Sequence, residues 1–552
     1  MKKIITIAAA LLMAGSSFAQ EALWGGASVT SPEINEDGTV NVSDLAVIKN
    51  NFTSNVTPSE ISTFIDKDNL KLTDWKIVVN DSAIEITGGS EEAAASALVY
   101  LEEHGSNGTY NIPVTISHTT DYDISTIFNN NVSISEYKIV INENDKIAAE
   151  YAQYIYDYIA ELSGFGLPIV SDTEAAYDYE ILVGSTSRRN NPITAVEEYN
   201  VYEEDGKFYV FYGDEQSAEM ACLDLCEKIL GKDSEGYDDD GHVNVVAGAS
   251  YSGKWSVLSR FGVMSDSHIG ERYNWANYDW LYNAFENFET AHASKPLDFI
   301  VSLGDNIDDG YANTYAADYK VYLEEIKQLD ICDPVNPIDG RAVGKIPHYE
   351  LCGNHDPIAN QFDASGNLKI RFFKNKLWYT ENENGEKVAH IGFFTNYGGY
   401  PLHDYAYSGT YASYFSYGRV DDQMVKFVEE SIIAANAEGA KHIILYNHFG
   451  MSQQVGSPCL PETGLGKIAD VCEKYGIKLY FNGHEHDVPY SLRRYNEIYD
   501  YDVSMTAHKH AIVEITTLRA KVTIYNSADN SLFRTDIVPL SGRGTAKQTF
   551  AK

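Results

Sequence analysis

Five short polar clusters in the second half of the chain carry side chains that bind divalent metals. In chain order they are Asp266-Ser267-His268, Gly304-Asp305-Asn306, Gly353-Asn354-His355-Asp356, Asn447-His448 and Gly483-His484-Glu485-His486. Carboxylates, imidazoles and amide oxygens are ligands for hard and borderline divalent cations. The clusters supply enough ligands for two metal ions, with one histidine to spare. This set of side chains predicts hydrolysis of a phosphate ester.

Each cluster follows a short apolar run of residues, which predicts a buried strand. In open α/β sheets, ligands bind where the carboxyl ends of the strands meet. Clusters that lie far apart in the sequence can therefore converge in one site. The glycines before Asp305, Asn354 and His484 support this interpretation, because glycine permits tight turns and a close approach of the backbone.

From residue 256 onward, short apolar strands alternate with helices, which indicates an α/β core. The predicted strands cover 261–264, 299–303, 346–351, 390–395, 442–446 and 477–481, and the predicted helices cover 277–293, 316–329, 422–435 and 465–475. Three more strands follow in quick succession at 511–516, 521–525 and 531–538. The predicted fold class is therefore α/β (α+β), with a catalytic domain of two packed mixed sheets flanked by helices.

Residues 20–118 and 119–255 predict one or two small α/β modules ahead of this region. Both share a pattern of strand, polar turn, strand, glycine and helix, seen at 75–103 and again at 200–230. The second module resembles the non-catalytic α/β domain that precedes the barrel in several secreted glycoside hydrolases. That resemblance implies modules that position the enzyme or bind a carbohydrate or surface partner, without chemistry of their own.

The composition restricts the partners of the protein. A formal net charge of −39 argues against nucleic-acid binding through a basic patch, because such an acidic surface repels polyanions. It would also repel a phosphorylated substrate. A phosphate site must therefore create its own positive potential, and bound cations do so.

The amino terminus predicts the location of the mature protein. Residues 1–19 read as a secretory signal peptide, with Lys2 and Lys3 ahead of an apolar core and small residues up to Ala19. This leader has no cysteine for lipid attachment, and no later stretch predicts a membrane span. We therefore expect a secreted or periplasmic protein.

The five clusters, together with residues 258–540 around them, resemble the calcineurin-like metallophosphoesterase superfamily. The motifs of that family are Asp-x-His, Gly-Asp, Gly-Asn-His-Asp/Glu, a lone His after a strand and Gly-His-x-His, and all occur here in that order. The resemblance implies two ligand sets, which are Asp266, His268 and His486 for one ion and Asn354, His448 and His484 for the other. It implies that Asp305 bridges both ions and that His355 stays off them.

The chemistry of these residues suits those roles. Two divalent cations about 3.5–4 Å apart repel each other, and a shared carboxylate and hydroxide lower that cost. Metal-activated hydroxide would attack phosphorus in line with the leaving oxygen, while the metals spread the charge of the phosphoryl group. His355 would assist the leaving group by donating a proton, held by Asp356, Asp308 or another carboxylate. Manganese, iron, zinc and nickel all suit nitrogen and oxygen ligands.

The sequence thus predicts a secreted, metal-dependent phosphoric ester hydrolase that acts on a small phosphomonoester or phosphodiester. One alternative is a phosphodiesterase for nucleotides or lipid headgroups. Another is a carbohydrate- or surface-binding protein in which the phosphoesterase is an accessory domain. The expected division is a signal peptide at 1–19, modules at 20–118 and 119–255, a catalytic domain at 256–541 and a tail at 542–552.

Overall fold

The structure is a computed structural model of the 552-residue chain. It describes residues 54–66, 69–80, 83–269, 278–306, 332–334, 346–353, 356, 375–393, 422–451, 465–484, 486, 491–495, 497–503, 506, 508–541 and 546–551. The chain divides into two compact units, Met1–Lys254 and Trp255–Lys552. Within the described ranges, every helix falls short of the length and apolar character needed to cross a membrane.

The first unit begins with a sheet of order β2-β4-β3-β7 that packs against one helix. The bounds of this part are β1 Ser54–Val56, β2 Glu60–Ile65, β3 Trp75–Asn80, β4 Ala83–Gly88, α4 Glu91–Glu103, β5 Gly105–Ser106, β6 Thr109–Ile112 and β7 Thr115–His118. Ile77 and Ile86 alternate with exposed residues and pack against Leu101 of α4. Ser90 caps the amino terminus of α4, because its hydroxyl accepts a hydrogen bond from the Ala93 N–H.

The rest of the first unit is a six-stranded sheet of order β11-β10-β12-β14-β13-β16, beside a small sheet β15-β8-β9. Its elements are β8 Thr126–Asn129, β9 Val132–Ser133, η1 Ile134–Glu136, β10 Lys138–Ile141, α5 Lys146–Ser163, β11 Ile169–Ser171, β12 Glu180–Val183, β13 Glu198–Glu204, β14 Lys207–Tyr212, α6 Glu215–Leu223, η2 Asp224–Ile229, β15 His242–Asn244 and β16 Ser250–Lys254. Asp145 caps the start of α5, and Gly164 ends it in a left-handed conformation. Ile155 of α5 and Ala218 of α6 share a core with Val210 of the sheet.

The second unit is built from two mixed sheets. The first has the order β19-β20-β18-β17-β27-β28-β29-β30, with bounds β17 Val257–Met264, β18 Phe299–Ser302, β19 Cys332–Pro334, β20 Ile346–Glu350, β27 Lys509–Thr516, β28 Arg519–Asn526, β29 Leu532–Pro539 and β30 Lys547–Phe550. The second has the order β21-β22-β23-β24-β26-β25, with bounds β21 Asn375–Glu381, β22 Lys387–Phe393, β23 His442–Tyr446, β24 Leu479–Asn482, β25 Ser491–Tyr495 and β26 Ile498–Asp502.

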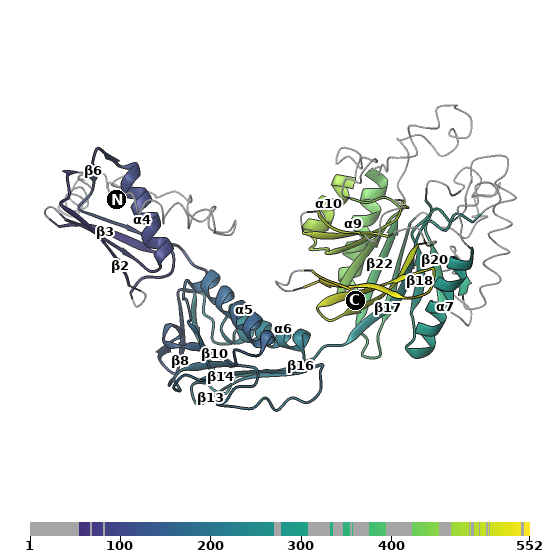
Figure 1. Ribbon diagram of the computed structural model, residues 1–552, viewed down its shortest axis with the longest axis horizontal. Helices are drawn as coiled ribbons and strands as arrows, with labels where there is room; N and C mark the ends of the chain where they lie inside the picture. Colours follow the sequence, from purple (N-terminus) through teal and green to yellow (C-terminus); the bar gives the residue numbers. More distant parts are fainter. Residues whose placement is uncertain are drawn as a thin grey trace. The chain divides into compact units, whose positions relative to one another are not determined.

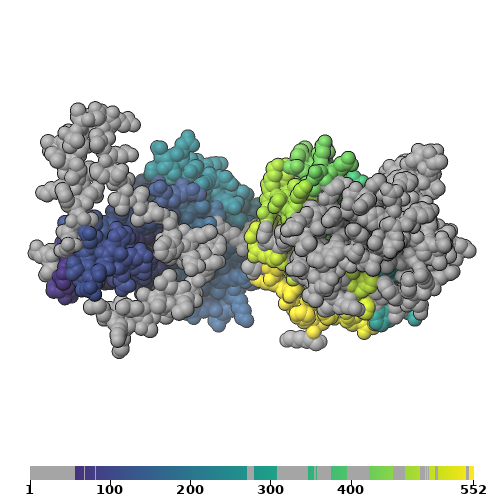
Figure 2. Space-filling view, turned by 90° about the horizontal axis from the view of Figure 1, so that it is seen from above, coloured from purple at the N-terminus to yellow at the C-terminus, as the bar shows by residue number. Residues whose placement is uncertain are grey.

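The two sheets pack face to face. Phe261 and Phe299 of the first sheet share one core with Tyr446 and Phe481 of the second. Helix α7 (Tyr278–Ser294) covers the outer face of the first sheet, and α9 (Asp422–Ala437) and α10 (Leu465–Lys474) cover that of the second (Figure 1). The green surface of α9 and the yellow carboxy-terminal strands are both visible in the space-filling view (Figure 2). The predicted α/β sandwich with flanking helices is confirmed.

The predicted elements of this unit agree with the structure where it describes them. The helix predicted at 316–329 lies outside the described residues. Strands β19, β21, β25, β26 and β30 were not among the predicted elements. The strand β21 is Asn-Lys-Leu-Trp-Tyr-Thr-Glu, with only Trp378 and Thr380 buried, so its hydrophobic pattern is weak.

Candidate metal centre

The polar clusters meet where the strands of both sheets end. Asp266 and His268 follow β17, Asp305 follows β18, and these strands belong to the first sheet. His448 follows β23 and His484 follows β24, which belong to the second sheet. Because β17 and β18 run parallel, as do β23 and β24, the residues that follow each pair of strands lie at the same end of their sheet. The site therefore lies at the carboxyl ends of these four strands.

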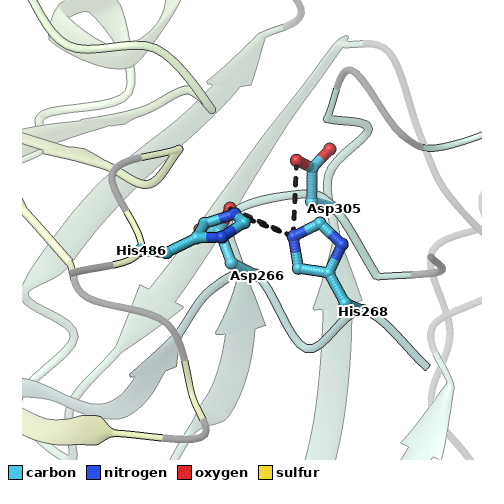
Figure 3. A group of neighbouring side chains, drawn as sticks. All are labelled: Asp266, His268, Asp305 and His486. Atoms are coloured by element: carbon cyan, nitrogen blue, oxygen red, sulfur yellow. Dashed lines mark hydrogen bonds and ion pairs between the residues drawn. The ribbon is translucent and has the colours of Figure 1, made fainter. Parts of the chain in front are cut away.

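A first group brings together two carboxylates and two imidazoles. Asp266, His268, Asp305 and His486 each offer one ligand atom, and these atoms all lie within 4.8 Å of one another. Their side chains point toward a common centre (Figure 3). His486 Nε2 lies 3.3 Å from Asp266 Oδ1 and 2.9 Å from His268 Nε2. Two imidazole nitrogens at that separation need a shared proton or a cation between them, so the group suits a divalent metal.

A second group shares Asp305 with the first. Asp305, His448 and His484 also place their ligand atoms within 4.8 Å of one another. His448 Nε2 lies 3.2 Å from Asp305 Oδ2, while His448 Nδ1 lies 3.1 Å from the carbonyl oxygen of Leu303. A hydrogen bond from Nδ1 to that carbonyl orients the ring and directs Nε2 toward the centre, as is usual for histidine ligands of metals.

Burial and charge adjust the protonation of the site. Burial opposes ionisation of Asp266, but the neighbouring His448 and His486 outweigh it and lower its pKa to about 2. Burial also disfavours the charged form of His448, yet Asp305 and Asp266 raise its pKa to about 9. Burial and the charge of His448 lower the pKa of His484 to about 3. A cation would therefore meet an ionised Asp266 and would have to displace the proton of His448.

Comparison with known proteins identifies the region that holds this site. Residues 259–488 match the family model described as calcineurin-like phosphoesterase. This region is a calcineurin-like phosphoesterase domain. The domain is that of a metal-dependent phosphoric ester hydrolase. No curated protein matches the chain.

Several solved structures are similar to part of the chain. The GAP50 anchor in the inner membrane complex of Plasmodium is 12% identical over 52% of this chain and 91% of its own, with a TM-score of 0.36. A dimetal phosphatase from Danio rerio is 11% identical over 53% of this chain and 99% of its own, with a TM-score of 0.35. A putative 5'-nucleotidase from Staphylococcus aureus is 13% identical over 52% of this chain and 55% of its own, with a TM-score of 0.31.

The backbone of the phosphoesterase domain is strained at the site. Left-handed conformations occur at four of its polar residues, with φ values of 51° at Asp266, 43° at His268, 49° at Asp305 and 80° at His484. Such conformations cost on the order of 1–3 kcal/mol each for residues other than glycine. Hydrogen bonds hold two of them: the Asp266 N–H donates to Gly304 O and the His268 N–H donates to Asp305 O, both at 3.0 Å.

The glycines that precede the ligands allow the loops to approach closely. A Cβ atom on Gly353 would lie 2.2 Å from Asp305 Oδ1, and one on Gly483 would lie 1.9 Å from Ser265 Oγ. A Cβ atom on Gly304 would lie 2.6 Å from the backbone nitrogen of Gly353. The close backbone approach predicted from the sequence is confirmed at these three positions.

Asp356 joins two of the ligand loops. Its Oδ1 accepts a hydrogen bond from the Asn306 N–H at 2.9 Å, and its Oδ2 accepts one from the Gly353 N–H at 2.7 Å. The Asn306 side chain also donates to Oδ2 at 3.1 Å. From the sequence, Asp356 was predicted only as a partner for His355, and its hydrogen bonds to Asn306 and Gly353 were not predicted.

Two of the expected site residues are not placed. Asn354 and His355, along with Asp308, lie outside the described residues. The structure brings the other six expected ligands together, which are Asp266, His268, Asp305, His448, His484 and His486. Asn447 has a local role, because its side chain donates to Phe393 O and accepts from the Phe449 N–H.

Proposed function

We propose that the phosphoesterase domain holds two divalent cations and hydrolyses a phosphomonoester or phosphodiester. The observation that carries this proposal is the position of Asp305, which belongs to both groups of ligand atoms. A carboxylate shared by two cations lowers their mutual repulsion, which is the requirement of a dinuclear site. The buried carboxylates also explain how a protein with a formal charge of −39 can bind a phosphate, since cations held there reverse the local potential.

The proposed ligands fall into two sets with one shared member. They are Asp266, His268 and His486 for one ion, Asn354, His448 and His484 for the other, and Asp305 for both. Bound cations would activate a water as nucleophile and neutralise charge on the phosphoryl group. Manganese, iron, zinc and nickel remain the candidate metals, because all accept this mixture of nitrogen and oxygen ligands.

The exposure of the ligands indicates the side from which substrate approaches. Asp266, His268, Asp305 and His448 are buried, whereas His484 and His486 are both half-buried. A phosphate ester would therefore reach the site on the side of His484 and His486. His355 is the proposed proton donor for the leaving oxygen, an assignment that rests on its place in the Gly-Asn-His-Asp motif.

Each part of the chain has a proposed role, and only one of these roles is catalytic. We assign residues 1–19 to a signal peptide and residues 256–541 to the catalytic domain, in a secreted or periplasmic protein. Residues 20–118 and 119–255 are proposed as modules that position the enzyme or bind a surface or carbohydrate partner. Retention of the purified protein on polysaccharides would support the binding role, and no retention on any glycan would remove it.

A metal-dependent assay tests the proposed function. The purified protein is stripped of metal, reloaded with each candidate metal, and assayed for phosphate or alcohol release from aryl and nucleotide monoesters and from nucleotide and glycerophospho diesters. We expect about two equivalents of metal and hydrolysis that is lost on stripping and restored on reloading. A protein that binds two metals and turns over diesters alone would favour the alternative phosphodiesterase. One that binds no metal would refute the proposal.

A further inference from the structure

We propose that Ser265 is a positioning residue that fixes the carboxylate of Asp266 and thereby sets the affinity of the first metal group. Ser265 lies just before the Asp-x-His motif and is not one of its members. Its hydroxyl oxygen lies 2.5 Å from Asp266 Oδ2. Because an ionised carboxylate can only accept, the hydroxyl donates, and bonds of this type are short and strong. This inference rests on the proposed metal centre.

The two oxygens of Asp266 have different surroundings. Oδ2 accepts from the Ser265 hydroxyl and also from the His484 N–H at 3.0 Å. Oδ1 instead faces the Nε2 atoms of His486 at 3.3 Å and His268 at 3.9 Å. With Oδ2 occupied by two donors, Oδ1 is the oxygen directed at a cation. Ser265 therefore favours coordination through one defined oxygen and opposes rotation of the carboxylate.

Ser265 is itself held in place by a residue from a distant loop. The Ser265 N–H donates to Thr506 Oγ1 at 3.1 Å, and Ser265 O accepts from the Thr506 N–H at 2.7 Å and from its hydroxyl at 2.5 Å. Both residues are fully buried. Gly483 completes the setting, because any Cβ there would collide with Ser265 Oγ. A buried serine whose backbone is held by Thr506 and whose hydroxyl donates to a ligand oxygen fits a positioning role.

Metal titration of the full-length protein tests this role. Metal-free wild type, Ser265→Ala, Ser265→Thr and Ser267→Ala are titrated with Mn²⁺ or Zn²⁺ by calorimetry, and His486→Ala identifies the equivalent bound by the first group. Ser267→Ala is the matched control, since its hydroxyl lies in the same loop but donates to the Asn306 carbonyl at 3.2 Å. We expect Ser265→Ala to weaken the His486-dependent equivalent by about 10–100-fold and to leave the other unchanged.

The outcomes separate the role of Ser265 from the metal centre itself. Recovery of affinity in Ser265→Thr, which keeps the hydroxyl, would support the positioning role, as would a normal second equivalent in Ser265→Ala. Wild-type affinity for both equivalents in Ser265→Ala would overturn the role, and so would equal losses in the alanine and threonine variants. If wild type itself binds no metal, the proposed function fails instead. Unfolding midpoints of the metal-free variants show whether Ser265→Ala still folds.

Discussion

The backbone N–H of His484 donates a hydrogen bond to Asp266 Oδ2 at 3.0 Å. These residues belong to different groups of candidate ligands, so the contact joins the two halves of the proposed dinuclear site. The backbone of His484 is left-handed, with a φ of 80°. The two halves are therefore in contact through this hydrogen bond as well as through the shared carboxylate of Asp305.

Substitution of the shared carboxylate should affect both ions. We expect Asp305→Asn to lower the affinity for both metal equivalents by at least about 100-fold, more than the loss typical of an outer partner, and to abolish hydrolysis. Elemental analysis after dialysis against limiting metal measures this. Full loading of Asp305→Asn with two ions would show that Asp305 is not the bridge.

Substitution of the proposed proton donor should leave the metals in place. In His355→Ala we expect metal content equal to wild type and a fall in kcat of about 10²–10⁴-fold, the usual contribution of a general acid. The fall should be smaller for substrates with good leaving groups, such as nitrophenyl esters, because these need less protonation. Loss of metal from His355→Ala would reverse its assignment.

Added bulk at Gly353 should disturb the bridging carboxylate. In Gly353→Ala the new Cβ would lie 2.2 Å from Asp305 Oδ1, so Asp305 or its loop must move. We expect at least a tenfold loss of activity and weaker metal binding, measured by activity against metal concentration. Gly439→Asn is a suitable control, because Gly439 has open space around it and asparagine tolerates its left-handed φ of 74°. Normal metal affinity in Gly353→Ala would contradict the close contact.

A buried histidine should make stability depend on pH. His390 lies between the two sheets, with hydrogen-bond partners in Thr380 and Tyr446, and burial lowers its pKa to about 3. The unfolded chain takes up a proton near pH 6.5, whereas the folded chain does not. The free energy of unfolding should therefore be greatest above pH 6.5 and fall by up to roughly 4 kcal/mol as the pH decreases toward 3.

A phenylalanine variant isolates this effect. His390→Phe keeps an aromatic ring beside Phe299, whose ring centroid is 4.8 Å from that of His390, and removes the titrating group. Urea unfolding of the metal-free protein across that pH range should show a shallower decline in His390→Phe than in wild type. Parallel declines would mean that His390 already carries a proton in the folded state.

The sequence predicted the parts of this fold that depend on local patterns. Apolar runs predicted β17, β18 and β23, and the polar residues that follow them were the predicted ligands, because a strand and its end are local features. The hydrogen bond from Ser265 to Asp266 was not predictable in this way. It requires Thr506 and Gly483, which come from distant loops, to meet Ser265. A lone serine before an aspartate carries no such signal.

The left-handed backbone conformations at the site could not be predicted from the sequence either. Asp266, His268 and His484 are left-handed although none is glycine, and sequence preference alone would place them elsewhere. Their conformations are imposed by tertiary hydrogen bonds, such as that from His268 N–H to Asp305 O. Structure predictions that use only residues adjacent in the sequence cannot include hydrogen bonds between loops that follow different strands.

The origin of the ligands in both sheets has a mechanical consequence. Asp266 and His268 project from the first sheet, whereas His448 and His484 project from the second. Ions held among them would link the two sheets where these strands end. Bound metal would then add to the shared hydrophobic core in holding the two sheets together, besides enabling turnover of substrate.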